Sequence, residues 1–297
     1  MKTLRLAVSA VISLLFLTSL RPVSAAETRP GSARNSLWKV EGRTNAVYLL
    51  GSIHVLKREN YPLAAPIEAA YTNSQVLVFE TDMDQMESGA FSMMEKFMLP
   101  EGETLKGQLP AVLYTNLVRH AGDAGVPMFL LDRLKPAMAA MTLEVFEYEK
   151  LGADPAYGLD KHFFDRAAKD GKKVVSLETI DFQIGLLTGF SKEEGELIVK
   201  TTLDDIDKTK MRYGEMVDAW QTGDAAKLAK LLNEAEQQAP AIFKRLVTDR
   251  NNRWVPQIEQ MLRDGKNVLV IVGAGHLVGE AGVVQLLKAH GFKVTQQ

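Results

Sequence analysis

The stretch Val47-Tyr-Leu-Leu-Gly-Ser-Ile-His54 is a short apolar run that ends in Gly-x-x-His, and Asn267-Val-Leu-Val-Ile-Val-Gly-Ala-Gly-His276 ends in the same way. Each run is short and rich in Val, Ile and Leu, so each is predicted to be a buried strand. The glycine permits a positive φ or the close approach of another group. Open α/β sheets bind ligands beside the carboxyl ends of their strands. We therefore expect His54 and His276 at one edge of a sheet.

Two further apolar runs end in a carboxylate. Val76-Leu-Val-Phe-Glu80 and Lys173-Val-Val-Ser-Leu-Glu178 are both predicted strands, so four strand ends carry His54, Glu80, Glu178 and His276. If the strands are neighbours in a mostly parallel sheet, all four side chains converge on one crevice. Met128-Phe-Leu-Leu131 is predicted to be another strand.

The remaining chain alternates helical patterns with these strands. Residues 37–40 and 47–50 read as a hairpin. Helices are predicted at 66–73, 84–98, 110–121, 136–150, 158–169 and 278–290, the second of them rich in Met. Residues 181–264 are helical throughout, either as a lid over the sheet edge or as part of the helical layer. The predicted fold class is α/β, with a central, mostly parallel sheet, helices on both faces and this helical insertion.

Two imidazoles and one or two carboxylates form a sufficient ligand set for a divalent metal, with a position left open for water. In this hypothesis His54, His276 and Glu80 or Glu178 bind the metal, which is Mn, Co or Zn. A bound metal lowers the pKa of its water, and the remaining Glu acts as general base. Taken singly, a Glu at a strand end commonly caps the next helix.

Composition narrows the class of protein. The chain has 297 residues, 46% of them hydrophobic and 24% charged, as expected for a globular protein with a sizeable core. A net charge of -2 without a run of Lys or Arg argues against a nucleic-acid partner. The absence of cysteine excludes disulfides, thiolate ligands and a Cys nucleophile.

The N-terminal segment has the pattern of an export signal. Residues 1–25 combine a basic start, an apolar run and small residues at a cleavage site. The apolar run is too short for a membrane span. Residues 26–36 are polar and predicted to be a disordered linker, and 37–297 are predicted to form the α/β domain. The mature chain is expected in the bacterial periplasm or outside the cell, without stable membrane insertion.

The other candidate residues have simpler interpretations. Ser52 is a further nucleophile candidate, although neighbouring residues at a strand end point apart. Arg250 and Asn251 lie on a predicted helix and read by themselves as a solvated face. His162 reads as core packing, and His290 as a favourable cation at a helix end.

With these residues in view, the sequence resembles the TraB/GumN family, which includes Tiki-type metalloproteases and is related to erythromycin-esterase-like and ChaN-like proteins. The resemblance runs from about residue 37 to 297. It is carried mainly by the two Gly-x-x-His motifs and also by five further segments: Val78-Phe-Glu80, Tyr157-Gly-Leu-Asp160, Leu177-Glu-Thr179, Gln183 and Arg250-Asn251.

The resemblance implies a peptidase that depends on a divalent metal, with Mn or Co favoured. It maps the family's two histidines and its strand-end Glu onto His54, His276 and Glu80. The Arg-Asn pair falls on Arg250 and Asn251, which makes them candidates for a substrate or oxyanion clamp. The esterase-like relatives imply a metal-free variant, and the ChaN-like relatives imply haem binding.

We therefore expect an exported hydrolase, a metal-dependent peptidase acting on peptide or other amide bonds. The alternatives are a metal-free esterase, a haem or small-ligand binder that uses the Met-rich helix as an apolar wall, and a protein that sequesters a secreted peptide. The partner is a peptide or a small-molecule substrate, and the oligomeric state is left open.

Overall fold

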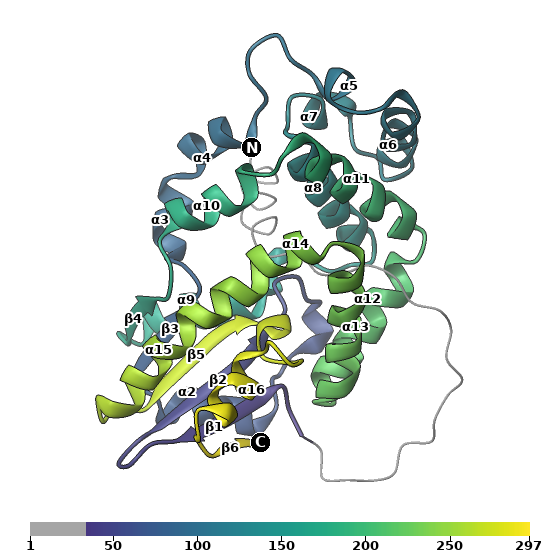
Figure 1. Ribbon diagram of the computed structural model, residues 1–297. Coiled ribbons are helices and arrows are strands. Elements are labelled where there is room, and N and C mark those ends of the chain that lie inside the picture. The colour runs from purple at the N-terminus through teal and green to yellow at the C-terminus, as the bar shows by residue number, and fades with distance from the viewer. Residues whose placement is uncertain (1–33) are drawn as a thin grey trace.

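The computed structural model describes residues 34–297 (Figure 1). The predicted export signal and most of the predicted linker lie outside the described residues. The last residues of the linker prediction are wrong, because Asn35 and Ser36 are buried in the fold. The Asn35 amide donates to the Gln297 carbonyl (2.6 Å), and the Ser36 hydroxyl donates to the Trp220 carbonyl (3.0 Å).

A six-stranded sheet with the order β4-β3-β5-β2-β1-β6 forms the centre of the described chain. The four strands β4, β3, β5 and β2 are parallel, and β1 runs antiparallel to both of its neighbours. The predicted hairpin and the four predicted strands that lead to the His and Glu residues are therefore present. The bounds are β1 Leu37–Glu41, β2 Ala46–Ser52, β3 Val76–Phe79, β4 Lys173–Ser176, β5 Val268–Gly273 and β6 Val294–Gln296.

Helices cover both faces of the sheet, as expected for an α/β fold. Phe164 of α9 (Leu159–Lys169) meets Phe79 of β3 on one face, edge to face with ring centroids 5.4 Å apart. On the other face, Pro256 and Met261 of α15 (Asp249–Arg263) share a hollow with Val78 of β3. The α/β prediction is confirmed.

The other helices form the two faces and a layer above the carboxyl ends of the strands (Figure 1). Short 3-10 turns lie at Arg58–Asn60, Pro155–Tyr157 and Ala274–His276, and a π-helical turn lies at Lys244–Thr248. The remaining helices are α2 Ala65–Asn73, α3 Met83–Ser88, α4 Ala90–Phe97, α5 Leu105–Gln108, α6 Ala111–Asp123, α7 Met128–Leu131, α8 Pro136–Lys150, α10 Ile180–Thr188, α11 Lys192–Ile206, α12 Thr209–Gln221, α13 Ala225–Gln238, α14 Pro240–Phe243 and α16 Val283–Ala289.

Three element predictions need correction. The predicted strand 128–131 is the short helix α7, because a four-residue apolar run does not distinguish a strand from a helical turn. The predicted helix 84–98 is two helices that meet at Gly89, whose amide closes α3 on the Gln85 carbonyl. The predicted helix 278–290 starts only at Val283, since Gly279 has a φ of +80° and breaks the helical path.

The helical segment 181–264 is packed directly onto the carboxyl edge of the sheet. The Trp220 indole N–H donates to the Gly51 carbonyl (2.7 Å), and the Tyr213 hydroxyl donates to the Val55 carbonyl (3.3 Å). Leu232 lies against Gly275 in the second motif. These contacts make the segment a fixed cover over both Gly-x-x-His loops.

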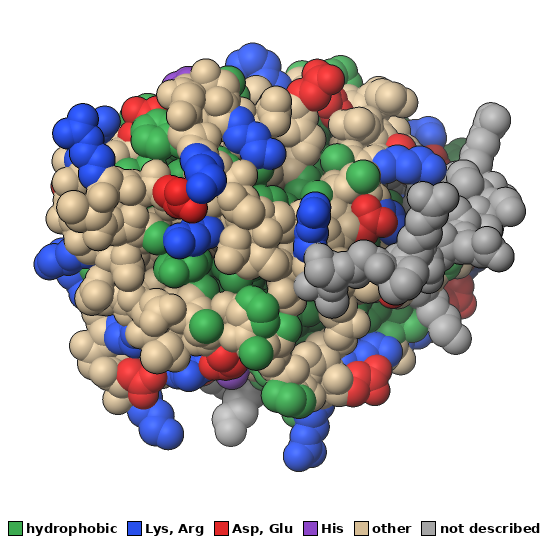
Figure 2. Space-filling model, turned by 90° about the horizontal axis from the view of Figure 1, so that it is seen from below, with side chains coloured by type: hydrophobic (Ala, Val, Ile, Leu, Met, Phe, Trp, Pro, Cys, Tyr) green, Lys and Arg blue, Asp and Glu red, His purple; other side chains and the backbone are tan. Residues whose placement is uncertain are grey.

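The surface has no single-sign character on the face shown in Figure 2, where Lys and Arg side chains alternate with Asp and Glu. This distribution agrees with the small net charge of the chain. It gives no footprint of the kind that binds a nucleic-acid backbone on that face.

Candidate active site

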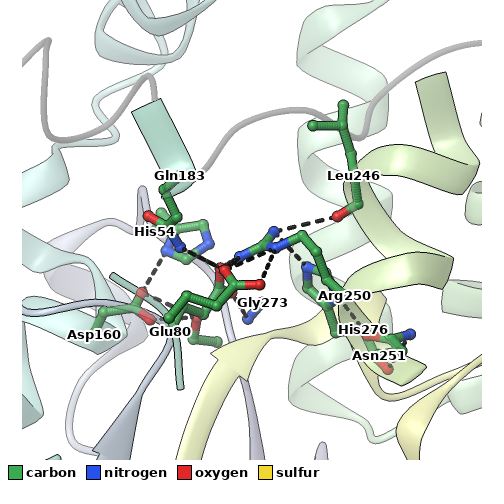
Figure 3. A network of polar contacts seen from close by, with 11 residues as sticks. His54, Glu80, Asp160, Gln183, Leu246, Arg250, Asn251, Gly273 and His276 are labelled. Atoms are coloured by element: carbon green, nitrogen blue, oxygen red, sulfur yellow. Dashed lines mark hydrogen bonds and ion pairs between the residues drawn. The ribbon is translucent and has the colours of Figure 1, made fainter. Parts of the chain in front are cut away.

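The carboxyl ends of β2, β3 and β5 bring both motif histidines to the same place (Figure 3). A Cβ atom on Gly273 would lie 3.4 Å from His54 Nε2, 3.4 Å from Glu80 Oε1 and 3.6 Å from His276 Cδ2. A Cβ on Gly51 would lie 3.0 Å from Ala274 Cα. The close approach of the two loops favours glycine at Gly51, whereas a Cβ at Gly273 would make only ordinary van der Waals contacts, and neither glycine has a positive φ.

His54 is oriented by Asp160, a residue that the motif analysis did not assign a role. His54 Nδ1 lies 2.5 Å from Asp160 Oδ2, and the Ser52 hydroxyl donates to both oxygens of the same carboxylate (2.8 and 2.9 Å). Asp160 sits in the first turn of α9, where the helix dipole favours an acid. The Leu159 amide donates to the Ile53 carbonyl (3.0 Å) and ties this turn to the motif.

This arrangement makes His54 a basic imidazole with an available ring nitrogen. Burial by itself lowers the pKa of His54, but the Asp160 carboxylate outweighs it and raises the pKa above the ordinary 6.5. Since Nδ1–H donates to Asp160, the Nε2 lone pair points toward Gly273 and Glu80. Among residues 34–297 no hydrogen-bond partner faces His54 Nε2, and the side chain is 14% exposed.

His276 is held by Asn251 in the same tautomer but in a different environment. Asn251 Nδ2 donates to the carbonyls of His276 (3.2 Å) and Ala281 (2.8 Å), which leaves its Oδ1 as the acceptor for His276 Nδ1 (2.7 Å). The ring packs on Trp254, with centroids 4.5 Å apart. Burial and the Arg250 charge lower the pKa of His276 to about 3, so this imidazole is neutral at physiological pH.

Arg250 fills the space between the two glutamates and His276, and all five of its N–H groups have acceptors. Nε donates to Glu178, and Nη2 donates to Glu80 Oε2 (2.6 Å) and Glu178 Oε2 (2.8 Å). Nη1 points at the Leu246 carbonyl and at His276 Nε2, both at 3.2 Å. Arg250 and Asn251 are buried, so their interpretation as a solvated face is wrong.

The guanidinium pairs with both glutamates and lowers the pKa of Glu80. Burial raises the pKa of Glu80, but Arg250, the two histidines and the Gly273 amide together lower it to about 2. Glu80 Oε1 accepts the Gly273 N–H (2.8 Å), so both of its oxygens are engaged. Gln183 of α10 donates to Glu80 (3.3 Å) and Glu178 (3.4 Å). Both glutamates therefore act as acceptors within a fixed network.

The sequence-predicted residues His54, Glu80, Glu178, Arg250, Asn251 and His276 thus lie together. Ser52 also lies here, but its hydroxyl is bound to Asp160. Sequence reasoning missed the contacts of Asp160 and Gln183 with this set. The signal for both residues was their place in the segments that carry the family resemblance, to which no role was attached.

The fit of this centre to a divalent metal is limited by Arg250. Glu80 and Glu178 pair with one guanidinium and Asp160 pairs with His54, so three carboxylates and one arginine leave an excess of negative charge that suits a cation. However, two atoms that a metal would need, His276 Nε2 and Glu80 Oε2, are contacted by Arg250. Among the described side chains, no group of three or more His, Asp or Glu is arranged to hold a metal ion. In this arrangement the residues do not fit a metal site.

These features define a class: an α/β protein with a centre of two histidines, two glutamates and an arginine at the carboxyl edge of its sheet. The chain belongs to the TraB/PrgY/gumN family, whose family model matches residues 36–296. The resemblance noted from the motifs is thereby confirmed.

Named relatives are distant. The chain is 25% identical to the uncharacterized protein YbaP of Escherichia coli over 81% of this chain and 87% of that protein. It is 22% identical to metalloprotease TIKI1 of Homo sapiens (93% of this chain, 67% of that protein) and 20% identical to a metalloprotease TIKI homolog of Nematostella vectensis (87% and 66%). No solved structure matches. Within residues 34–297, no helix has the length and apolar character needed to cross a membrane.

Proposed function

We propose that this protein is an exported hydrolase that cleaves peptide or other amide bonds at His54. The observation that carries the proposal is the bond between His54 Nδ1 and Asp160, which leaves Nε2 as a base of raised pKa at a partly exposed point of the centre. The names of the TIKI relatives as metalloproteases support a peptide substrate class, and the N-terminal signal pattern supports export.

In the proposed reaction, His54 Nε2 takes a proton from a water molecule whose oxygen bonds to the scissile carbonyl carbon. The Asp160 carboxylate stabilises the imidazolium that forms, because it already accepts a hydrogen bond from Nδ1. The C–N bond then breaks and His54 returns the proton to the leaving amine. One water is consumed and no other reactant is required.

In this mechanism His54 acts as the general base, in place of Glu80 or Glu178. A carboxylate whose pKa is about 2 and whose two oxygens are engaged is a poor proton acceptor near neutral pH. The proposal also changes the role of Arg250 and Asn251. All of their N–H groups already have acceptors, so in this arrangement they position Glu80, Glu178 and His276 and have no donor free for an oxyanion.

Gln183 supplies a polar contact for the substrate. Its Oε1 atom is buried, and no described residue donates a hydrogen bond to it. A buried acceptor without a donor is costly, so a substrate N–H group at this position would be favoured. An amide substrate offers such a group beside its scissile carbonyl.

A metal ion at this centre requires that Arg250 first release His276 Nε2 and Glu80 Oε2. No step above is routed through a metal. Metal analysis of the purified mature protein, before and after loading with Mn, Co or Zn, measures whether this release occurs.

The test is a peptide-library digest by the mature protein, with products identified by mass spectrometry. We expect cleavage by the wild type, loss of cleavage in His54→Ala, and unchanged cleavage in the control His290→Ala, which removes a half-exposed histidine at the end of α16. Equal cleavage by His54→Ala would overturn the mechanism. Peptide binding without any cleavage would favour the sequestering protein in place of the hydrolase.

A further inference from the structure

Strand β4 is an edge of the sheet and borders the proposed catalytic centre. In the described chain it pairs only with β3, and Glu178 follows its last residue, Ser176, by two positions. An unpaired edge exposes a row of N–H and C=O groups that can pair with an added strand. The four residues of β4 are exposed or half-buried, so the strand is accessible.

The hydrogen-bond pattern fixes which groups face the open side. The Leu177 amide donates to the Phe79 carbonyl (2.9 Å), and Phe79 is in register with Ser176. In a parallel pair, alternate residues of a strand bond to the same neighbour. Residues 173, 175 and 177 therefore point their amides at β3. Val174 and Ser176 direct their N–H and C=O groups to the open edge.

Each face of β4 has a hollow next to this edge. On the α9 face, a hollow of about 440 Å³ is bordered by Val174, Ser176 and Phe164 and by two acids, Asp82 and Asp84. On the α15 face, a hollow of about 770 Å³ has six apolar lining residues, Val76, Val78, Val175, Val268, Pro256 and Met261, beside five polar or charged ones, Lys173, Gln257, Gln260, Asp264 and Lys266. Successive side chains of a strand point to opposite faces, so an added strand would place alternate residues in the two hollows.

From this geometry we infer that the β4 edge binds an extended segment of the polypeptide substrate as an additional strand. The inference rests on the proposed function and specifies its substrate class. The acidic α9 hollow takes basic side chains, and the apolar residues of the α15 hollow take aliphatic ones. The segment that binds best therefore alternates Lys or Arg with Val, Ile or Leu.

β4 lies three strands from β2, which leads to His54, so a segment bound at this edge approaches the centre from its Glu178 side. Strand residues advance about 3.3 Å each, so a peptide that continues beyond Ser176 reaches the level of Glu178 within roughly 7 Å. Glu80 and Glu178 immediately follow the paired strands β3 and β4, and the Glu178 amide donates to the Glu80 carbonyl (2.9 Å). Main-chain pairing at the edge supplies affinity, and the two hollows supply selectivity.

The probe for the test is a fluorescein-labelled, capped ten-residue peptide of alternating Lys and Val. Its affinity is measured by fluorescence anisotropy with the mature His54→Ala chain, in which turnover is blocked. Val174→Pro removes an edge N–H that does not pair with β3, and Asp84→Lys cancels the net negative charge of the acidic hollow, because Asp82 remains. The matched control is Asp123→Lys, on the distant helix α6.

We expect Val174→Pro to raise the Kd about tenfold or more, as the loss of one or two main-chain hydrogen bonds would. Asp84→Lys is expected to raise the Kd, and Asp123→Lys to leave it unchanged. A version of the peptide N-methylated at every residue has no main-chain N–H to donate and should bind at least tenfold more weakly. This second measurement keeps the test decisive if Val174→Pro does not fold.

Undiminished binding of the N-methylated peptide, or no binding of the probe to the parent chain, would overturn the inference. A dimer in light scattering that Val174→Pro converts to a monomer would also overturn it, because the edge would then be occupied by a second copy of the chain. The binding measurement needs no turnover. Edge binding without cleavage by the wild type therefore refutes the hydrolase alone, and cleavage without edge binding refutes the edge site alone.

Discussion

The two Gly-x-x-His motifs have the same sequence pattern and give their histidines opposite chemical properties. His54 is oriented by a carboxylate, its pKa is raised, and its Nε2 atom lies at a partly exposed point of the centre. His276 is oriented by an amide, its pKa is lowered to about 3, and its Nε2 is contacted by a guanidinium. The environment of each ring, supplied by α9 for one and α15 for the other, makes the difference.

This comparison teaches that a repeated motif does not imply a repeated role. In both rings Nδ1–H is fixed by an acceptor on a helix, so both rings are equally well oriented. The charge beside each ring differs, negative at Asp160 and positive at Arg250, and His276 is also more deeply buried. We therefore assign proton transfer to His54 and a structural, neutral role to His276, and the predictions below test this asymmetry.

The largest expected effect is on catalysis by His54→Ala. Loss of a general base typically reduces the rate about 10²–10⁴-fold, and we expect a fall of about 10³-fold in kcat. Peptide hydrolysis under saturating substrate measures it. The asymmetry would be contradicted if His276→Asn, which keeps a polar neutral side chain, lowered kcat as much as His54→Ala does.

Asp160→Asn is expected to lower kcat roughly 10²-fold, because the imidazolium loses its counter-charge. The base must be neutral to accept a proton, so activity rises with pH through the pKa of His54. Without the carboxylate this pKa falls, and the acidic limb of the pH–rate profile moves to lower pH. The control Asp165→Asn removes an exposed carboxylate from the same helix. If the acidic limb of the Asp160→Asn pH–rate profile stays at the wild-type pH, the assignment of His54 as the base is contradicted.

Arg250→Met tests the guanidinium that distinguishes the His276 side. Removing one member of a buried ion pair typically costs about 3–5 kcal/mol, and here Glu80 and Glu178 would both lose their partner. Urea unfolding measures the loss, with Arg253→Met on the same helix as the control.

The Arg250→Met variant also frees His276 Nε2 and Glu80 Oε2, so titration calorimetry should show Mn²⁺ binding about tenfold or more tighter than in the wild type. Unchanged Mn²⁺ affinity would mean that Arg250 does not compete with a metal.

Asn251→Asp is expected to have the smallest effect on activity, because it acts on the ring assigned a structural role. It also removes the Nδ2 donor to the His276 and Ala281 carbonyls. It gives His276 a carboxylate partner like that of His54, so the pKa of His276 should rise by about one unit or more. NMR titration of the histidine rings measures this shift, and Asn252→Asp provides an exposed neighbouring control. A His276 pKa that stays at about 3 would show that burial alone sets it.

Much of the fold follows from the sequence because periodic patterns report local structure directly. The runs at 47–50, 76–79 and 268–272 are buried on both faces, and a continuous apolar run of this length is typical of a strand in a parallel sheet. The run at 128–131 is equally apolar but forms a helical turn. Periodicity could not distinguish a strand from a helical turn at 128–131, because the run is too short to complete either pattern.

The sequence by itself determined that His54, Glu80, Glu178 and His276 follow strands, and the rules of α/β folds then predicted that they meet at one edge. Only the tertiary structure decided which charge lies beside each histidine. Asp160 and Arg250 are far from the motifs in the chain, and their contacts depend on how α9 and α15 dock on the sheet. Protonation and ligand availability depend on the distances between such groups, and no local pattern of residues encodes those distances.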